Sequence, residues 1–312
     1  MTVENSSENA FGQENTEELL EAAVLKSGYP LQRVVAAELK KSFSRVTEEW
    51  SYIDRTTEEP RELDVFAFQA LRGESEHRIK PAVILLVECK RAELPHVFFK
   101  TAVGVRSDDF PRVLGLAREA MTLKDASNRS RSISLIDALQ LSNEPFIADG
   151  PPLCTGFSRA VRKGKHLILS GASPFRRLFL PLVSALTHAI KYYTPPGSPK
   201  LYWANLTFCV AVLDGPMVVA ESDPEHPNLS LQPWVRVVRH EVSLKDKGVR
   251  RETYYAIDVV HRSFLANFVR RHLFPFANVF AERVEAVHES LFLGHGCVAD
   301  VDRLDWREIK PG

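Results

Sequence analysis

The stretch AVILLVECK, residues 82–90, decides the expected fold because it has the composition of a strand covered on both sides. Successive side chains of a strand point to opposite faces, and here both faces are apolar until Glu88. Strands covered on both sides are typical of parallel or mixed sheets flanked by helices. Polar side chains appear only at the end of the stretch, where open α/β sheets usually carry their sites. We therefore expect an α/β protein with a functional site at Glu88 and Lys90.

An acidic residue in the preceding strand-like segment strengthens this expectation. Asp64 lies within ELDVFAF, residues 62–68, and a carboxylate among apolar neighbours is costly unless it is paired or binds a cation. Glu88 and Lys90 share one face of their strand, roughly 7 Å apart at Cα. Asp64 and Glu88 would supply the oxygen ligands that a hard divalent cation prefers. Lys90 would orient an attacking water and offset developing negative charge.

These motifs resemble those of the PD-(D/E)XK nuclease superfamily, which has the restriction-endonuclease-like fold. The match runs from Gly28 to about Phe99. The segment at residues 28–43, GYPLQRVVAAELKKSF, resembles the opening helix of that core. The segment at residues 47–68, TEEWSYIDRTTEEPRELDVFAF, resembles the hairpin that carries its metal-binding Asp. The segment at residues 84–90, ILLVECK, resembles the strand that carries its Glu and Lys. The resemblance implies hydrolysis of phosphodiester bonds that depends on Mg²⁺, or on Mn²⁺ as the alternative, with Asp64 and Glu88 as ligands.

The opening helix departs from the family pattern. Many members carry a Glu there, whereas the matching position in this chain is Gln32. Glu38, six residues later, lies on a different helical face and is a weaker substitute. Gln32 can still bind a metal through its carbonyl oxygen or hold a water, but it lowers the negative charge. The candidate catalytic residues are therefore Asp64, Glu88, Lys90 and Gln32.

The distribution of charge points to a local surface for nucleic acid. The chain has 40 Lys and Arg against 40 Asp and Glu, which excludes a uniformly basic coat. Residues 151–200, however, contain no Asp or Glu, and a local basic patch is what phosphate contact requires. A solvated face balanced by acids elsewhere is the alternative. The residues expected to contact nucleic acid, with DNA favoured, are Arg159, Arg162, Lys163, Lys165, Arg176 and Arg177.

The remaining pattern predicts a single elaborated nuclease-like domain over residues 16–312, after a disordered acidic tail at residues 1–15. Its core, a mixed sheet flanked by helices, comprises residues 28–100 and 170–220. Strands are expected at 45–53, 62–70, 82–90 and 206–214, and helices at 16–26, 29–43, 173–193 and 261–289. The helix at 173–193 would cross over and place the strand at 206–214 beside that of Glu88.

Three further elements are expected outside this core. Asp214-Gly215 is a hairpin signal between two strand-like runs, LTFCVAVLD and PMVVAES. WVRVVRHEV and ETYYAIDVV should form a second hairpin, which with the helix at 261–289 elaborates the C-terminal part. Helices are also expected near 110–123 and 133–140.

Composition limits the cellular setting. The four cysteines form no CxxC pair, which argues against a zinc ribbon and a disulfide scaffold. The N-terminus does not read as a signal peptide, and the longest apolar run is too short to span a bilayer. We expect a cytoplasmic protein without a membrane partner. The sequence leaves the oligomeric state open, a homodimer included.

Three classes of function remain open. The first is a metal-dependent nuclease. The second is a catalytically inactive nuclease-like module that binds nucleic acid or a defence or repair partner, and Gln32 favours it. The third is an α/β protein in which Asp64 and Glu88 are only structural.

Overall fold

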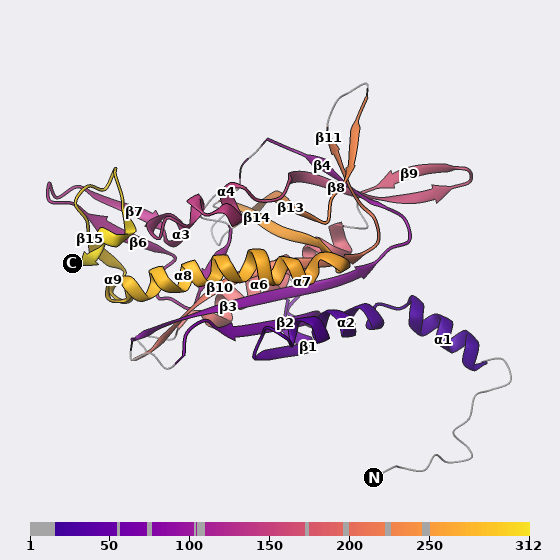
Figure 1. Ribbon diagram of the computed structural model, residues 1–312, viewed down its shortest axis with the longest axis horizontal. Helices are drawn as coiled ribbons and strands as arrows, with labels where there is room; N and C mark the ends of the chain where they lie inside the picture. The colour runs from indigo at the N-terminus through magenta and orange to yellow at the C-terminus, as the bar shows by residue number, and fades with distance from the viewer. Residues whose placement is uncertain are drawn as a thin grey trace, which may run out of the picture.

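The computed structural model describes residues 16–54, 57–73, 77–102, 104, 110–171, 175–195, 200–221, 226–244 and 250–312. It is a mixed α/β protein with a 12-stranded mixed sheet, a second sheet of four strands and several helices (Figure 1). The predicted acidic tail at residues 1–15 lies outside the described residues. No helix in the described part of the chain is long and apolar enough to cross a membrane.

The helices are short, and several follow one another with few residues between. They are α1 (Glu17–Lys26), α2 (Tyr29–Leu39), α3 (Leu135–Ala138), α4 (Pro145–Ala148), α6 (Leu180–Tyr193), α7 (Leu265–Asn267), α8 (Phe274–Ala286) and α9 (His288–Leu293). Two π-helical segments extend them: η2 (Phe175–Phe179) leads into α6, and η4 (Phe268–Leu273) joins α7 to α8. Short 3₁₀ turns are η1 (Leu141–Asn143), η3 (Arg262–Phe264) and η5 (Trp306–Glu308).

The strands belong to two sheets. The large sheet holds β1 (Arg45–Ile53), β2 (Pro60–Ala70), β3 (Ile79–Arg91), β4 (His96–Lys100), β5 (Arg112–Leu114), β8 (Leu153–Lys163), β9 (His166–Ser170), β10 (Tyr202–Asp214), β11 (Met217–Glu221), β12 (Asn228–Leu231), β13 (Trp234–Leu244) and β14 (Arg250–His261). The small sheet holds β6 (Ala120–Lys124), β7 (Ser130–Ser134), β15 (His295–Cys297) and β16 (Lys310–Pro311).

The order of strands makes β3 a central strand. The large sheet runs β1-β2-β3-β10-β14-β13-β8-β4-β11-β12, with β5 beside β10 and β9 beside β8. β3 is antiparallel to β2 and parallel to β10, in a register that pairs Glu88 with Ala211. Parallel neighbours require a crossover connection, and α6 precedes β10 in the chain. The predicted addition of the strand near 206–214 to the sheet of Glu88 is confirmed.

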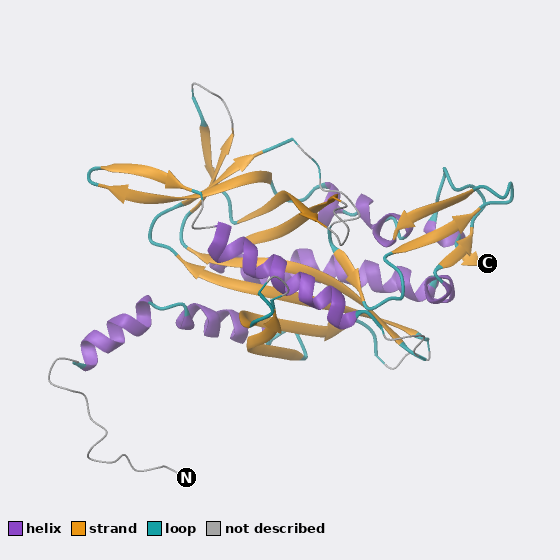
Figure 2. Cartoon of the chain, turned by 180° about the vertical axis from the view of Figure 1, so that it is seen from behind, coloured by secondary structure: helices purple, strands orange, loops and turns teal. Residues whose placement is uncertain are grey.

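Two layers of side chains bury β3, one on each face. Val83, Leu85 and Val87 belong to a core cluster with residues of α2 and α8. Ile84 and Leu86 belong to a second cluster with residues of α6. Figures 1 and 2 show α8 and α6 on opposite sides of the large sheet. The run of apolar residues in β3 is therefore explained by burial on both faces.

The expected first hairpin and its strands are confirmed, since β1, β2 and β3 cover the predicted ranges. The C-terminal hairpin is also confirmed as β13 and β14, which pair from Trp234 opposite Val260. The expected helix at 261–289 is a succession of η3, α7, η4, α8 and α9, and Pro275 stands in the first turn of α8.

Two expectations are wrong. β10 does not form a hairpin with β11, because β3, β14 and β5 already take its backbone groups, and β11 pairs with β4 and β12 instead. At the predicted turn, a Cβ on Gly215 would lie 2.1 Å from the carbonyl oxygen of Ala92, so the glycine allows the chain to pass the β3–β4 connection. The helix expected near 110–123 is replaced by β5 and β6, and that near 133–140 shortens to α3.

Candidate functional site

Asp64 lies at an irregular point of β2. The register of β1 with β2 skips the position opposite Asp64, where Glu49 has a left-handed backbone with φ of 53°. Leu63 and Val65 then pack into opposite core clusters, although residues two apart in a regular strand share one face. The irregularity turns the half-buried carboxylate of Asp64 toward the end of β3.

The carboxylate of Asp64 takes the place of a backbone acceptor. The last registered pair of β2 and β3 at this end is Val65 with Val87. Beyond it, Oδ2 of Asp64 accepts a hydrogen bond from the backbone N–H of Cys89 at 2.6 Å. A buried N–H without a partner costs about 1–3 kcal/mol, so this bond stabilises the end of the ladder. Asp64 therefore has a structural role in this site whatever chemistry it supports.

Glu88 and Lys90 meet Asp64 from the adjacent strand. Nζ of Lys90 donates a hydrogen bond to Oε1 of Glu88, and the same Nζ lies 3.8 Å from Oδ2 of Asp64. The side chain of Glu88 is only 7% exposed, whereas that of Lys90 is 33% exposed. Both carboxylates thus contact one ammonium group, which joins the three predicted residues in one cluster.

The cluster has more negative charge than Lys90 can balance. Burial, and after it the nearby Asp64 carboxylate, raise the pKa of Glu88 to about 7 against the opposing effect of Lys90. Burial alone would lower the pKa of Lys90, but Glu88 and Asp64 outweigh burial and raise it. Lys90 is therefore held as a cation, while the protonation of Glu88 is sensitive to any further positive charge.

Gln32 reaches the cluster through the backbone of Asp64. Gln32 is buried on α2, and its Nε2 donates a hydrogen bond to the carbonyl oxygen of Asp64 at 3.0 Å. Glu38, considered as the substitute acid, instead binds Lys41 and Arg270, at 2.8 Å for the latter. Gln32 is thus the residue of α2 that the fold brings to Asp64, and Glu38 is held elsewhere.

A cavity of about 470 Å³ opens beside these residues. Asp64, Lys90 and Gln32 line it, whereas Glu88, which is bonded to Lys90, is not among its lining residues. Its other polar lining residues were not predicted from the sequence. These are Lys26, Tyr29, Glu49, Glu62 and Arg91. Of these, only Glu62 could have been predicted from the sequence, because it stands two residues before Asp64 in the same strand.

The predicted basic residues divide into two groups. Arg177, in η2, lines the cavity of Asp64 and Lys90. Arg162, Lys163 and Lys165 are exposed at the tip of the β8–β9 hairpin, which projects from the large sheet (Figure 1). Arg176 is exposed beside Arg177, and Arg159 lies half-buried opposite His96 in the β4–β8 pair.

The donor set fits a hard divalent cation, but only partly. The oxygen atoms of Asp64 and Glu88 converge on the ammonium group of Lys90. Mg²⁺ is commonly held by one or two carboxylates and keeps several waters. Within the described ranges, no three His, Cys, Asp or Glu side chains gather as a metal cluster. A cation here would rely on two acids, with carbonyl oxygens and waters.

Comparison of the chain with known proteins finds no matching family model, no similar curated protein and no similar solved structure. The resemblance to the PD-(D/E)XK superfamily therefore stays a prediction from the motifs. Any function assigned to the chain depends on the geometry of Asp64, Glu88 and Lys90.

Proposed function

We propose that this chain is a metal-dependent nuclease of the restriction-endonuclease-like class, which hydrolyses phosphodiester bonds of nucleic acid, with DNA as the favoured substrate. The observation that carries the proposal is the contact of Asp64 and Glu88 with one ammonium group, that of Lys90, beside an open cavity. The order α2, β1, β2, β3, α6 and parallel β10 agrees with the core that the motifs led us to expect.

Asp64 and Glu88 would hold Mg²⁺, or Mn²⁺ in its place, with Gln32 contributing its carbonyl oxygen or an ordered water. The bound ion would supply Lewis-acid stabilisation of the charge on a phosphate and a more acidic water. Lys90 neutralises part of the charge of both carboxylates in this structure, and it would be free to act on the substrate when they hold a cation.

The chain's own residues bind and orient the substrate around this point. Arg177 and Lys26 line the cavity and would contact the phosphates that flank the bond to be cleaved. Lys90, once released from Glu88, would donate a hydrogen bond to the attacking water or to a phosphate oxygen. A preorganised donor of this kind acts where negative charge develops in the transition state.

The direct test is a cleavage panel. Purified protein should be incubated with single- and double-stranded DNA and RNA in Mg²⁺, Mn²⁺ or EDTA. We expect cleavage with a divalent cation and none with EDTA. Asp64→Asn should abolish both cleavage and the calorimetric signal of Mn²⁺ binding, whereas Glu221→Gln, which changes an exposed acid on β11, should alter neither.

The inactive nuclease-like module is the second candidate, and one observation favours it. The helical position that many family members fill with Glu holds Gln32, whose amide nitrogen is used in the bond to Asp64. Binding of nucleic acid without cleavage in any metal would support this candidate. If Asp64→Asn instead lowers the stability of the fold without changing its affinity for metal, Asp64 has a purely structural role. The hydrogen bond from the backbone N–H of Cys89 to Asp64 is consistent with such a role.

A further inference from the structure

The cavity beside Asp64 and Lys90 is the first of three hollows that share lining residues. Arg91 lines this carboxylate cavity and also a second hollow of about 580 Å³, formed at the Asp214-Gly215 turn and called here the turn hollow. Gln232 and Pro233 line both the turn hollow and a third hollow of about 620 Å³. The three hollows therefore follow one another from the end of β3 toward the start of β13.

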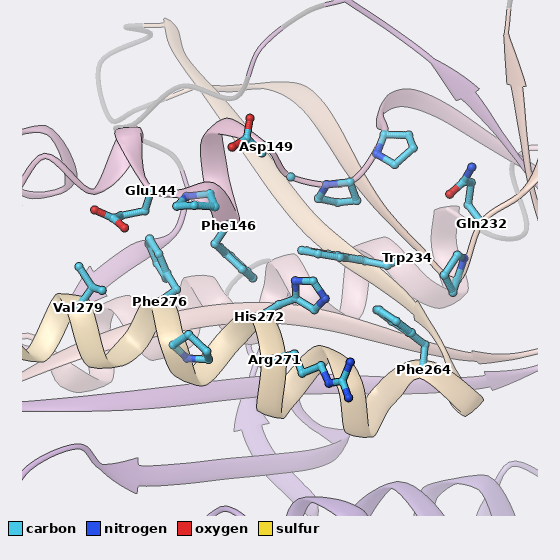
Figure 3. Close-up of a pocket in the computed structure, with 16 residues that line it drawn as sticks. Glu144, Phe146, Asp149, Gln232, Trp234, Phe264, Arg271, His272, Phe276 and Val279 are labelled. Atoms are coloured by element: carbon cyan, nitrogen blue, oxygen red, sulfur yellow. The ribbon is translucent and has the colours of Figure 1, made fainter.

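The third hollow is an aromatic pocket between the α4 segment and the η4–α8 helix (Figure 3). Its lining includes the rings of Phe146, Trp234, Phe264, His272 and Phe276. The ring of His272 lies 5.0 Å from that of Trp234 and 5.8 Å from that of Phe264, between centroids. Such a volume is typical of pockets that enclose a small organic group.

A buried network holds the wall of this aromatic pocket. Nε1 of Trp234 donates to Oδ1 of Asp258 at 3.0 Å, and Asp258 is paired with Arg236 at 2.8 Å. Arg236 also donates to the carbonyl oxygen of Phe146 at 3.2 Å. The ring of Trp234 and the backbone of Phe146 are thus held in place by hydrogen bonds before any ligand binds, which favours a preorganised pocket.

Charged side chains of both signs line this path. Arg91 and Arg271 are cationic, while Glu93 and Asp214 line the turn hollow and Glu144 and Asp149 line the aromatic pocket. Asp214 lies 3.8 Å from Arg91, and Glu144 is paired with Arg283. Arg271 is exposed and lines the aromatic pocket, next to His272 in sequence (Figure 3). Arg91 marks the junction of the turn hollow and the carboxylate cavity. Proteins that bind single strands combine positive charge along the backbone with aromatic rings on which bases stack.

We infer that the aromatic pocket receives an unpaired base of a single-stranded segment of nucleic acid, whose backbone continues past the turn hollow to the carboxylate cavity. The inference rests on the proposed function, because it identifies the substrate as a strand with at least one unstacked base. A base inside a duplex is stacked on its neighbours and cannot enter such a pocket without leaving the helix. Phe264, half-buried at the pocket, would stack on the base, and Arg271 would contact a phosphate.

The test measures binding without catalysis. Fluorescence anisotropy in EDTA should compare a labelled single-stranded oligonucleotide with a blunt duplex of the same sequence, at one fixed salt concentration. We expect tighter binding of the single strand, and a loss of roughly 5- to 150-fold in that affinity for Phe264→Ala, as for removal of one stacking ring. Phe264→Tyr should retain the affinity. Thermal unfolding checks that each variant is folded.

The neighbouring arginine provides a matched control. Arg271→Ala should weaken single-strand binding, whereas Arg270→Ala should not, because Arg270 binds Glu38 at 2.8 Å and does not line the pocket. Equal affinity for the single strand and the duplex, or an unchanged affinity in Phe264→Ala, would overturn the inference. A mononucleotide that competes as tightly as the oligonucleotide would also overturn it, since it would show an isolated nucleotide pocket.

The outcomes separate this inference from the proposed function. If Phe264→Ala loses single-strand binding but the wild type cleaves no substrate in Mg²⁺ or Mn²⁺, the nuclease proposal fails and the base pocket stands. If the wild type cleaves, while Phe264→Ala binds and cleaves single strands normally, the base pocket fails and the nuclease proposal stands.

Discussion

Glu88 is a buried carboxylate in contact with Lys90 and near Asp64, and its ionisation opposes folding in the absence of a cation. Its pKa is about 7 in the folded protein against an ordinary value of 4.5. Below pH 4.5 the group is protonated in both the folded and the unfolded state, so its contribution to stability is fully present. The contribution is lost as the pH rises from 4.5 through 7, by on the order of 3 kcal/mol.

This titration predicts a pH-dependent effect of Glu88→Gln. In EDTA, the variant should gain free energy of unfolding relative to the wild type as the pH rises from 4.5 to 8, because the amide cannot ionise. Urea unfolding of both proteins at these two pH values measures the difference. A difference that stays constant with pH would show that Glu88 ionises as freely in the folded protein as in the unfolded chain.

Lys90→Ala separates catalysis from metal binding. Lys90 is a cation and not a ligand, so its removal should leave the Mn²⁺ affinity nearly unchanged or stronger. Hydrolysis should fall on the order of 10²–10³, as for the loss of one preorganised donor. The matched control is Lys80→Ala, near the start of the same strand, which should keep the wild-type rate. Single-turnover rates in saturating Mg²⁺ provide the measurement, and near wild-type cleavage by Lys90→Ala would contradict the assigned role.

The predicted contact of Asp64, Glu88 and Lys90 follows from simple rules, but the bond that orients Asp64 does not. Strand periodicity placed Glu88 and Lys90 on one face, and the apolar run placed them at a buried end. The hydrogen bond from Cys89 to Asp64 depends on where the β2–β3 ladder stops, and on the left-handed backbone of Glu49. Such a conformation is uncommon outside glycine, and no local pattern in the sequence indicates it.

At the scale of elements, β13 and β14 are joined by a buried ion pair. Arg236 and Asp258 have no exposed side-chain surface, and Arg236 donates to both oxygen atoms of the carboxylate, at 2.8 and 3.3 Å. The guanidinium group also lies 4.2 Å from the ring centre of Phe110. Removing one partner of a buried pair leaves an uncompensated charge, which costs about 3–5 kcal/mol.

Asp258→Ala should therefore lower the free energy of unfolding by about 3–5 kcal/mol. The surface pair of Lys100 with Glu221 is the control, because both side chains are 48% exposed, and Glu221→Ala should change stability by less than about 1 kcal/mol. Chemical denaturation of the two variants gives both values. Equal effects would mean that burial does not distinguish the two pairs.

Elements with strong local patterns were predictable, but only some of their partners were: the pairs β3–β10 and β13–β14 were predicted, and those of β11 were not. The runs that form β2, β3 and β10 are apolar and β-branched, and their ranges were confirmed. The Asp214-Gly215 signal was genuine for a turn, but it could not reveal that β10 is saturated by other strands. The aromatic pocket was not predicted either, because Phe146, Trp234 and Phe264 are far apart in the sequence and come together only through tertiary packing.

At the scale of the whole molecule, the predicted basic residues lie in the β8–β9 hairpin and in η2, which leads into α6. The β8–β9 hairpin projects at one end, and the small sheet with β6, β7 and β15 lies at the other (Figure 1). The acid-free stretch at 151–200 was expected from the sequence to form one surface. The structure places Arg177 at the carboxylate cavity and Arg162, Lys163 and Lys165 at the hairpin tip.

This arrangement predicts that the hairpin tip adds phosphate contacts to those made at the carboxylate cavity. Reversal of Arg162, Lys163 and Lys165 to Glu should weaken nucleic-acid binding, because each phosphate that the protein no longer neutralises keeps its counterions. The slope of log affinity against log salt should become shallower by about 0.7–0.9 for each such phosphate. The control variant carries the same change of charge in and near the small sheet. It combines Lys124→Glu, Arg131→Glu and Arg303→Glu, all at exposed positions. Anisotropy titrations over a range of salt concentrations compare the two triple variants. If both triple variants change the affinity and the salt slope equally, net charge alone is responsible. If neither variant changes the affinity or the slope, the hairpin is a solvated face, and the nucleic acid binds at Arg177 without contacting the hairpin.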